Sequence, residues 1–356
     1  MPKNIILLSD GTGNSASKLF KTNVWRLYQA LDVAEPGAAK PGEMPKSAAG
    51  ERAQPMQVAY YDDGVGTAAF TPLAILGGAF GWGLKRNVLD LYTFLCRHYE
   101  EGDSIYCFGF SRGAFTIRVL TGLVANQGLV SNLKEGKLRR LAADAFRAYR
   151  ENRYPGSFLT KIFRGLRAGL LWVWYKITRR TKYNPKLNRP APKIKFLGLW
   201  DTVAAYGLPV DELTHAWNYV FPLSFPDRNL SDRIERACHA LALDDERLSF
   251  HPELWNENEE DYRRKRAQLQ GAEAKPARHI QERLTQIWFA GMHTNVGGGY
   301  PDDGMAHVSL DWIMTEAEAS ELRFKQEDRE QLKAAADING KMYDSRGGVG
   351  CAYRYL

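Results

Sequence analysis

Cysteine is scarce in this 356-residue chain, and its four copies form no Cys-x-x-Cys pair: Cys96, Cys107, Cys238 and Cys351. A small disulfide-stapled fold and a zinc ribbon are therefore both excluded. Long apolar runs are also missing. The run Ile5–Leu8 is too short for the core of a signal peptide, and no stretch approaches the length of a membrane span. We therefore expect a cytoplasmic globular protein with reduced thiols.

Acidic residues are nearly absent from one part of the chain. Residues 131–193 contain 17 lysines and arginines against three acidic residues, a net charge of +14. The rest of the chain contains 31 basic and 38 acidic residues, a net charge of −7. So basic a segment on an acidic body suits an anionic partner, either a phospholipid surface or nucleic acid. A solvated basic face without a partner is the other interpretation.

Short β-type runs alternate with helical patterns along the sequence. We predict strands at residues 5–9, 57–61, 104–110, 193–200 and 285–290. We predict helices at residues 23–31, 84–99, 112–125, 230–243, 308–318 and 325–337. This alternation predicts an α/β fold, with a mainly parallel sheet flanked by helices and functional groups beyond the carboxyl ends of the strands. We find no internal repeat and expect a single domain over residues 1–356.

The sharpest motif is Gly-x-Ser-x-Gly at Gly109, Ser111 and Gly113. An apolar strand precedes it and an apolar helix follows it, which is the context of a nucleophile elbow. Glycines flank the serine because so tight a turn leaves no room for a Cβ atom. The serine then stands at a helix N-terminus, where the helix dipole and the N–H of Arg112 favour a developing oxyanion. The other interpretation is a glycine-rich turn with an idle serine.

A serine nucleophile needs an acid and a base, which follow it in this architecture in the order Ser, Asp or Glu, His. Asp201 directly follows one predicted strand and His293 lies just beyond another, so both should reach the same rim as Ser111. His293 is preferred among the seven histidines because glycines at 297–299 allow its loop to turn tightly. Asp245 also follows an apolar segment and is the alternative acid.

The loop after the first strand is expected to complete the oxyanion hole. Its small residues permit close backbone approach, so Gly11 and Thr12 are the predicted donors. Asp10 is expected to hold the loop by accepting backbone hydrogen bonds. A phosphate-binding Asp-Gly-Thr turn is the alternative, although no Walker lysine or second carboxylate cluster accompanies it. Ester hydrolysis by such a site would need no metal or organic cofactor.

Several segments, in order over nearly the whole chain, resemble the bacterial α/β-hydrolase domain family that includes phospholipase effectors of type VI secretion. These segments are residues 8–14, 61–67, 78–83, 102–114, 198–203, 239–244, 288–293 and 296–300. The resemblance implies an α/β-hydrolase fold and a triad of Ser111, Asp201 and His293. It also implies ester hydrolysis, with glycerophospholipids as substrates of the secreted members. Export by a type VI system and binding to a secretion-system or immunity protein would follow.

The basic segment 131–193 lies between the serine strand and the Asp201 strand, a usual place for a cap in α/β-hydrolases. We expect it to form a basic helical cap or lid. Within 159–180, apolar side chains share one helical stripe and most basic side chains lie off it. This cationic, Trp-rich pattern is typical of a helix on a membrane surface, and a cap helix packed on the body is the alternative. Nucleic acid is disfavoured because the aromatic residues mostly follow the apolar stripe.

Together these features predict a serine hydrolase that cleaves carboxylic esters, above all those of glycerophospholipids. An esterase for small soluble esters and a catalytically silent binding module with a hydrolase-like fold are the alternatives. A binding module would not react with a serine-directed probe, whereas either enzyme would.

Overall fold

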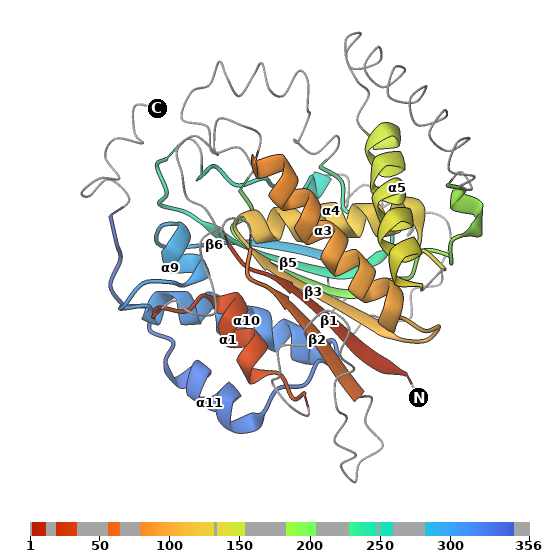
Figure 1. The fold of residues 1–356 in the computed structure, drawn as a ribbon. Coiled ribbons are helices and arrows are strands. Elements are labelled where there is room, and N and C mark those ends of the chain that lie inside the picture. Colours follow the sequence, from red (N-terminus) through yellow and green to blue (C-terminus); the bar gives the residue numbers. More distant parts are fainter. Residues whose placement is uncertain are drawn as a thin grey trace, which may run out of the picture.

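The computed structural model describes residues 2–11, 19–33, 56–64, 79–131, 134–153, 183–203, 228–247, 250–258 and 282–344. Six parallel strands form one sheet in the order β2-β1-β3-β4-β5-β6 (Figure 1). The strands are β1 Lys3–Ser9, β2 Met56–Asp62, β3 Ser104–Phe110, β4 Ile194–Trp200, β5 Ile234–Ala242 and β6 Leu284–Phe289. The predicted α/β fold with a parallel sheet flanked by helices is confirmed. All six carboxyl ends therefore meet at one edge of the sheet.

Helices cover both faces of this sheet (Figure 1). One face carries α3 Ala79–His98, α4 Arg112–Gln127 and α5 Glu135–Arg153. The other carries α1 Asn23–Ala30, α9 His293–Gly297, α10 Gly304–Ala319 and α11 Gln326–Ala334. Successive strand residues point to opposite faces, so Leu7 packs into the core beneath α3 and α4 and Leu8 into the core above α10. A strand buried on both faces reads as a continuous apolar run, as β1 does.

The helix predicted over residues 230–243 is wrong, because Ile234–Ala242 forms strand β5. This strand pairs with β4 on one side and β6 on the other. Eight of its nine residues are buried, so no alternation of apolar and polar residues marks it as a strand. Apolar runs buried on both faces of a parallel sheet resemble buried helices in sequence. The alanines at 237, 240 and 242 strengthened the wrong assignment, since alanine is the best helix former.

Part of the predicted cap belongs to the helical layer. Helix α5 packs against α3 and α4, and a short 3₁₀ turn, Pro185–Leu187, precedes β4. The amphipathic stretch 159–180 lies outside the described residues, so a cap over the site and a membrane contact through this stretch stay predictions. Within the described ranges, none of the helices is both long enough and apolar enough to cross a bilayer.

The core position of β1 yields a test of the fold. Leu7 is 0% exposed, and we expect Leu7→Ala to lower the free energy of unfolding by about 2–5 kcal/mol, because it leaves a cavity between sheet and helices. Urea denaturation followed by circular dichroism measures the change. Leu187, which is 71% exposed, provides the control Leu187→Ala, expected to change stability by less than about 0.5 kcal/mol. Equal losses in the two variants would contradict the placement of β1.

Candidate active site

Ser111 occupies the sharp turn between β3 and α4. Its backbone has φ 57° and ψ −125°, a conformation that residues with a side chain rarely adopt and that costs on the order of 1–3 kcal/mol. The Ser111 N–H donates a hydrogen bond to the carbonyl oxygen of Trp200 at 3.0 Å, which ties the turn to the end of β4. The strained serine thus stands at the N-terminus of a 16-residue helix, α4.

The two glycines of the motif make this turn possible. A Cβ atom on Gly113 would lie 2.1 Å from the carbonyl oxygen of Ser9 and 2.5 Å from that of Asp10. A Cβ atom on Gly109 would lie 2.7 Å from the Cα of Ala114. These neighbours are backbone atoms in a sheet or helix, so they cannot move aside cheaply. The end of β1 therefore packs directly against the first turn of α4.

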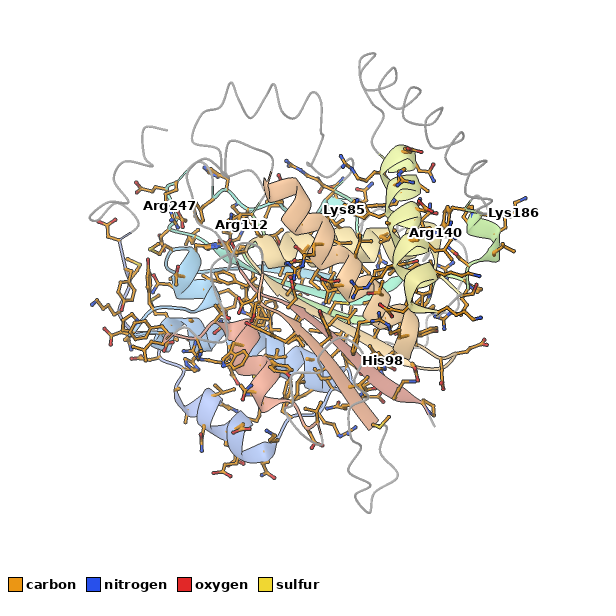
Figure 2. All side chains as sticks on the ribbon, in the orientation of Figure 1. Lys85, His98, Arg112, Arg140, Lys186 and Arg247 are labelled. Atoms are coloured by element: carbon orange, nitrogen blue, oxygen red, sulfur yellow. The ribbon has the colours of Figure 1, made fainter. Side chains whose placement is uncertain are left out.

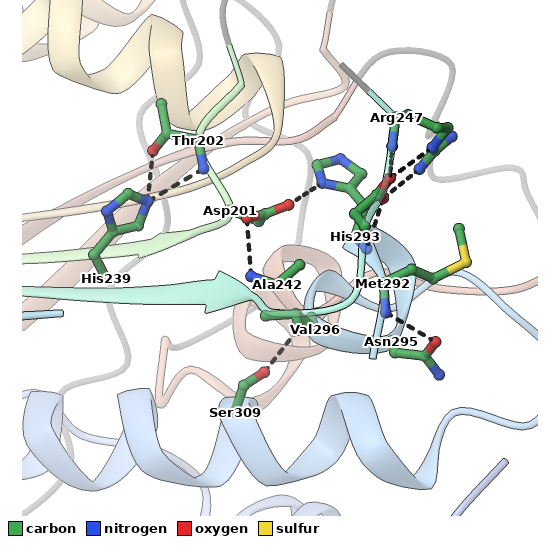
Figure 3. Close-up of polar contacts among 11 residues, drawn as sticks. Asp201, Thr202, His239, Ala242, Arg247, Met292, His293, Asn295, Val296 and Ser309 are labelled. Carbon is green, nitrogen blue, oxygen red and sulfur yellow. Dashed lines mark hydrogen bonds and ion pairs between the residues drawn. The ribbon is translucent and has the colours of Figure 1, made fainter. Parts of the chain in front are cut away.

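Asp201 and His293 are in contact at the carboxyl edge of the sheet (Figure 3). Asp201 directly follows β4, and His293 begins the short helix α9 beyond β6. The Nδ1 atom of His293 lies 2.5 Å from Oδ2 of Asp201, so the imidazole and the carboxylate form a short hydrogen bond. Both side chains are buried. A carboxylate on Nδ1 favours the tautomer in which Nε2 is the acceptor, as a general base requires.

The carboxylate of Asp201 is fully buried and is satisfied by the protein. Its Oδ1 accepts the N–H of Ala242 at 3.0 Å, while Oδ2 faces His293. Its own N–H donates to the carbonyl oxygen of Ala240 at 2.7 Å. The backbone at Asp201 has φ +38°, an unusual value for a residue with a side chain. Both hydrogen bonds to β5 hold this strained residue in place.

A buried histidine supports the residue that follows the acid. The Nε2 atom of His239 accepts the N–H of Thr202 at 3.2 Å and lies 2.9 Å from its Oγ1 (Figure 3). Burial, together with the charge of Arg118, lowers the pKa of His239 to about 3. His239 thus stays neutral and accepts hydrogen bonds from Thr202. Its Nδ1 lies 3.2 Å from Oε1 of Gln286 on β6.

Asp245, the alternative acid, contacts a different part of His293. Its Oδ2 accepts the backbone N–H of His293 at 3.1 Å, and Arg247 binds both of its oxygens. The imidazole of His293 faces Asp201 instead. The geometry therefore favours Asp201 over Asp245 as the partner of the ring.

Two aromatic rings enclose the imidazole. The centroids of Phe110 and His293 are 4.6 Å apart, and those of Phe250 and His293 are 4.9 Å apart with nearly perpendicular planes. Phe110 immediately precedes Ser111, so this contact places the imidazole beside the nucleophile elbow. The rings fix the plane of the imidazole and exclude water from its faces.

The loop after β1 is held by Asp10. Its Oδ1 accepts the N–H of Gly11 at 2.6 Å, and its Oδ2 accepts the hydroxyls of Thr22 at 2.5 Å and Tyr61 at 2.6 Å. Burial raises the pKa of Asp10 to about 6, although these hydrogen bonds lower it in part. Since the Gly11 N–H points at Asp10 here, its use as an oxyanion donor requires exchange of that bond. Thr12 lies outside the described residues.

Arg112 is the first residue of α4. Its N–H therefore lies in the first turn, where backbone N–H groups have no acceptor within the helix itself. Burial lowers the pKa of its guanidinium to about 10. Figure 2 shows Arg112 and Arg247 toward the carboxyl edge of the sheet and Arg140 and Lys186 beside α5. Arg112 therefore lies at the edge that carries Ser111, and Arg247 is paired there with Asp245.

The supporting contacts of His239 and Arg247 could not be predicted from the sequence, because they depend on strand register and not on spacing along the chain. Among the described residues, no three His, Cys, Asp or Glu side chains are grouped so that they could hold a metal ion.

The fold defines an α/β protein with its candidate site at the carboxyl edge of a parallel sheet. Over residues 3–316 the chain matches the family described as "T6SS, Phospholipase effector Tle1-like, catalytic domain", where T6SS is the type VI secretion system. The match covers most of the chain, which therefore belongs to this family. The predicted resemblance is confirmed.

The chain is also similar to a yeast protein and to two solved structures. The uncharacterized protein YEL023C from Saccharomyces cerevisiae is 27% identical over 262 residues, which are 70% of this chain and 32% of that protein. A crystal structure of an uncharacterized protein from Pseudomonas aeruginosa aligns with a TM-score of 0.43 and 18% identity, over 95% of this chain and 49% of the other. The Tle1 effector, solved bound to the VgrG spike of the type VI system, aligns with a TM-score of 0.36 and 15% identity, over 85% and 52%. This chain thus spans about a third of the yeast protein and about half of each solved chain.

The close packing at Gly113 predicts that even one methyl group is not tolerated there. We expect Gly113→Ala to lower the free energy of unfolding by about 1–3 kcal/mol, the cost of forcing extra volume into a packed site. Gly136→Ala in α5 is the matched control, because a Cβ atom there meets nothing within 4 Å. That control should be neutral or slightly stabilising, since alanine favours helix. Thermal unfolding of both variants measures the difference, and an unaffected Gly113→Ala would contradict the elbow packing.

The raised pKa of Asp62, which lies next to the loop that Asp10 holds, predicts that stability depends on pH. Burial raises its pKa to about 7, although hydrogen bonds from Ser9 and Asn87 oppose the shift. The folded protein therefore keeps a proton that the unfolded chain loses, so stability falls as the pH rises from about 4 to about 7. Asp62→Asn removes this titration and keeps an acceptor oxygen. Relative to wild type, we expect it to gain on the order of 2 kcal/mol at neutral pH, and nothing at about pH 4.

Urea denaturation of both proteins across this pH range measures the effect. The exposed Asp302, changed to Asn, is the control. A difference between wild type and Asp62→Asn that is the same at both ends of the range would contradict the raised pKa.

Proposed function

We propose that this chain is a serine hydrolase that cleaves carboxylic esters of glycerophospholipids through Ser111, His293 and Asp201. The observation that carries the proposal is the 2.5 Å contact between His293 and Asp201, set beside a serine in a strained strand-to-helix turn. A buried carboxylate paired with histidine and a serine in a costly backbone conformation are typical of a nucleophilic hydrolase.

In this mechanism Nε2 of His293 takes the proton of the Ser111 hydroxyl as Oγ attacks the ester carbonyl. Asp201 holds the imidazole in the required tautomer and stabilises the imidazolium that forms. His293 then donates its proton to the leaving alcohol, and an acyl-enzyme remains on Ser111. Water, activated by the same histidine, releases the fatty acid and restores the serine.

The oxyanion would bind at the start of α4. The N–H of Arg112 and the positive end of the helix dipole stabilise negative charge there. A second donor would come from the loop after β1, where Gly11 exchanges its bond to Asp10 for the substrate oxygen, or from Thr12. The hydrogen bond from Gly11 to the substrate oxygen would then form only in the transition state, where such a bond contributes most to the rate.

Two observations support phospholipids over small soluble esters. The family to which the chain belongs is described as a phospholipase effector family of the type VI secretion system. The basic segment 131–193 also suits an anionic lipid surface. We further infer that the protein is delivered by a type VI system and that its partners include components of that system or an immunity protein.

The direct test is the release of fatty acid from vesicles of phosphatidylethanolamine and phosphatidylglycerol. We expect wild type to release fatty acid and Ser111→Ala to release none above background, because no acyl-enzyme can form. Asp201→Asn should lose about 10³–10⁴-fold in kcat, because it stabilises the wrong tautomer of His293. Circular dichroism and labelling by a serine-directed fluorophosphonate accompany the assay.

Release that persists in Ser111→Ala would overturn the assignment of the nucleophile. Ser111-dependent hydrolysis of a p-nitrophenyl ester without release from vesicles would keep the mechanism and move the substrate to small esters. A folded protein that releases no fatty acid, hydrolyses no p-nitrophenyl ester and is not labelled by the fluorophosphonate would favour a binding module.

A further inference from the structure

We infer that Asp245 and Arg247 position the base His293 by fixing its backbone and one face of its ring. The inference rests on the proposed function, in which His293 is the base. It gives Asp245 a role distinct from that of Asp201, although both carboxylates approach the same histidine.

His293 needs such support because of where it lies in the chain. It begins α9, a helix of only five residues, and it follows Gly291, whose φ of +100° allows a sharp change of direction. So short a helix supplies few internal hydrogen bonds to hold its first residue. The position of the imidazole therefore depends on contacts with other parts of the chain.

The loop after β5 provides these contacts. Asp244 accepts the N–H of Gly291 at 2.6 Å through Oδ2, and its own N–H donates to the carbonyl oxygen of Gly291 at 3.1 Å. Asp245 accepts the N–H of His293 at 3.1 Å. The backbone is thus held both at His293 and two residues before it.

Arg247 fixes Asp245 in turn. Its Nε donates to Oδ1 at 2.9 Å and one terminal nitrogen to Oδ2 at 2.6 Å, the bidentate geometry that arginine alone provides. The guanidinium carbon also lies 3.5 Å from the ring centroid of Phe250, whose ring meets that of His293. One arginine therefore supports the histidine along two routes, through its backbone and through its ring. Figure 3 shows Arg247 beside His293.

The ionisation of Asp245 fits this role. Burial would raise its pKa, but the hydrogen bonds and charge of Arg247, with the N–H of His293, outweigh burial and lower it. Asp245 therefore stays ionised to a lower pH than a free aspartate, and its oxygens act as acceptors.

The test compares Arg247→Ala, Arg247→Lys and Asp245→Asn with wild type in the fatty-acid release assay. We expect Arg247→Ala to lower kcat by about 10- to 100-fold with KM changed less than about twofold, because a displaced base affects chemistry and not binding. Arg247→Lys keeps the charge but not the bidentate contact and should fall between. Asp245→Asn keeps an acceptor oxygen and should lose far less than Asp201→Asn.

The matched control is Arg329→Ala on α11. Arg329 is also a partly buried arginine, with a side chain 12% exposed against 18% for Arg247, and it pairs with Asp311 at 2.6 Å. It lies away from the candidate site, so its loss should leave kcat within about twofold of wild type even if stability falls comparably.

A second readout does not depend on turnover. The proton shared by His293 and Asp201 should give a low-field ¹H resonance, assigned by its absence from His293→Ala. We expect Arg247→Ala to broaden or shift this resonance and Arg329→Ala to leave it unchanged. Should Arg247→Ala not fold, Arg247→Lys and Asp245→Asn carry the same comparison.

A folded Arg247→Ala with wild-type kcat and an unchanged resonance would overturn the inference while leaving the proposed function intact. Asp245→Asn with a loss as large as that of Asp201→Asn would also overturn it, because Asp245 would then act as the acid. Activity that does not depend on Ser111 would remove the proposed function instead. In that case the resonance still decides whether Arg247 positions His293.

Discussion

The register of β5 is the constraint on which the candidate site depends. This strand carries none of the three proposed catalytic side chains, yet it holds two of them. The backbone of Ala240 and Ala242 binds Asp201 from one side. The loop that follows β5 binds Gly291 and His293 from the other. The 2.5 Å contact between His293 and Asp201 is thus set by a strand between their own two strands. A shift of one residue in its register would reverse every side chain of β5.

Burial of this contact explains why so much of the surrounding structure is committed to it. A carboxylate removed from water is costly unless each oxygen finds a donor, and removal of one partner leaves the other unsatisfied. Asp201 meets this condition with one backbone N–H and one imidazole. The adjacent Thr202 is held by His239, which accepts its N–H because burial keeps the imidazole neutral. The dry surroundings that make the pair costly also strengthen its electrostatic effect on a reacting serine.

The sequence predicted those features that follow from local pattern. Ser111 could be proposed from the sequence because two glycines and a strand-helix context constrain the turn locally. The close approach of Gly113 to Ser9 shows why a glycine is needed there. Strand β5 was mistaken for a helix because burial on both faces removes the alternation that identifies strands. The predicted strand before Asp201 favoured it as the acid, but chain order left Asp245 as an alternative. The contacts in three dimensions distinguish them, because one faces the imidazole and the other the backbone N–H.

Three carboxyl groups near the same edge of the sheet differ in electrostatic character because their partners differ. Asp245 has an arginine beside it, and its pKa is lowered. Asp10 is surrounded by neutral donors, which compensate burial only in part, so its pKa rises to about 6. The pKa of Asp62 rises further, to about 7. Asp245, beside His293, therefore keeps its charge to a lower pH than Asp10 and Asp62, which lie at the ends of β1 and β2. Because Gly11 donates its N–H to Asp10, protonation of that carboxyl weakens the bond that competes with a substrate oxyanion.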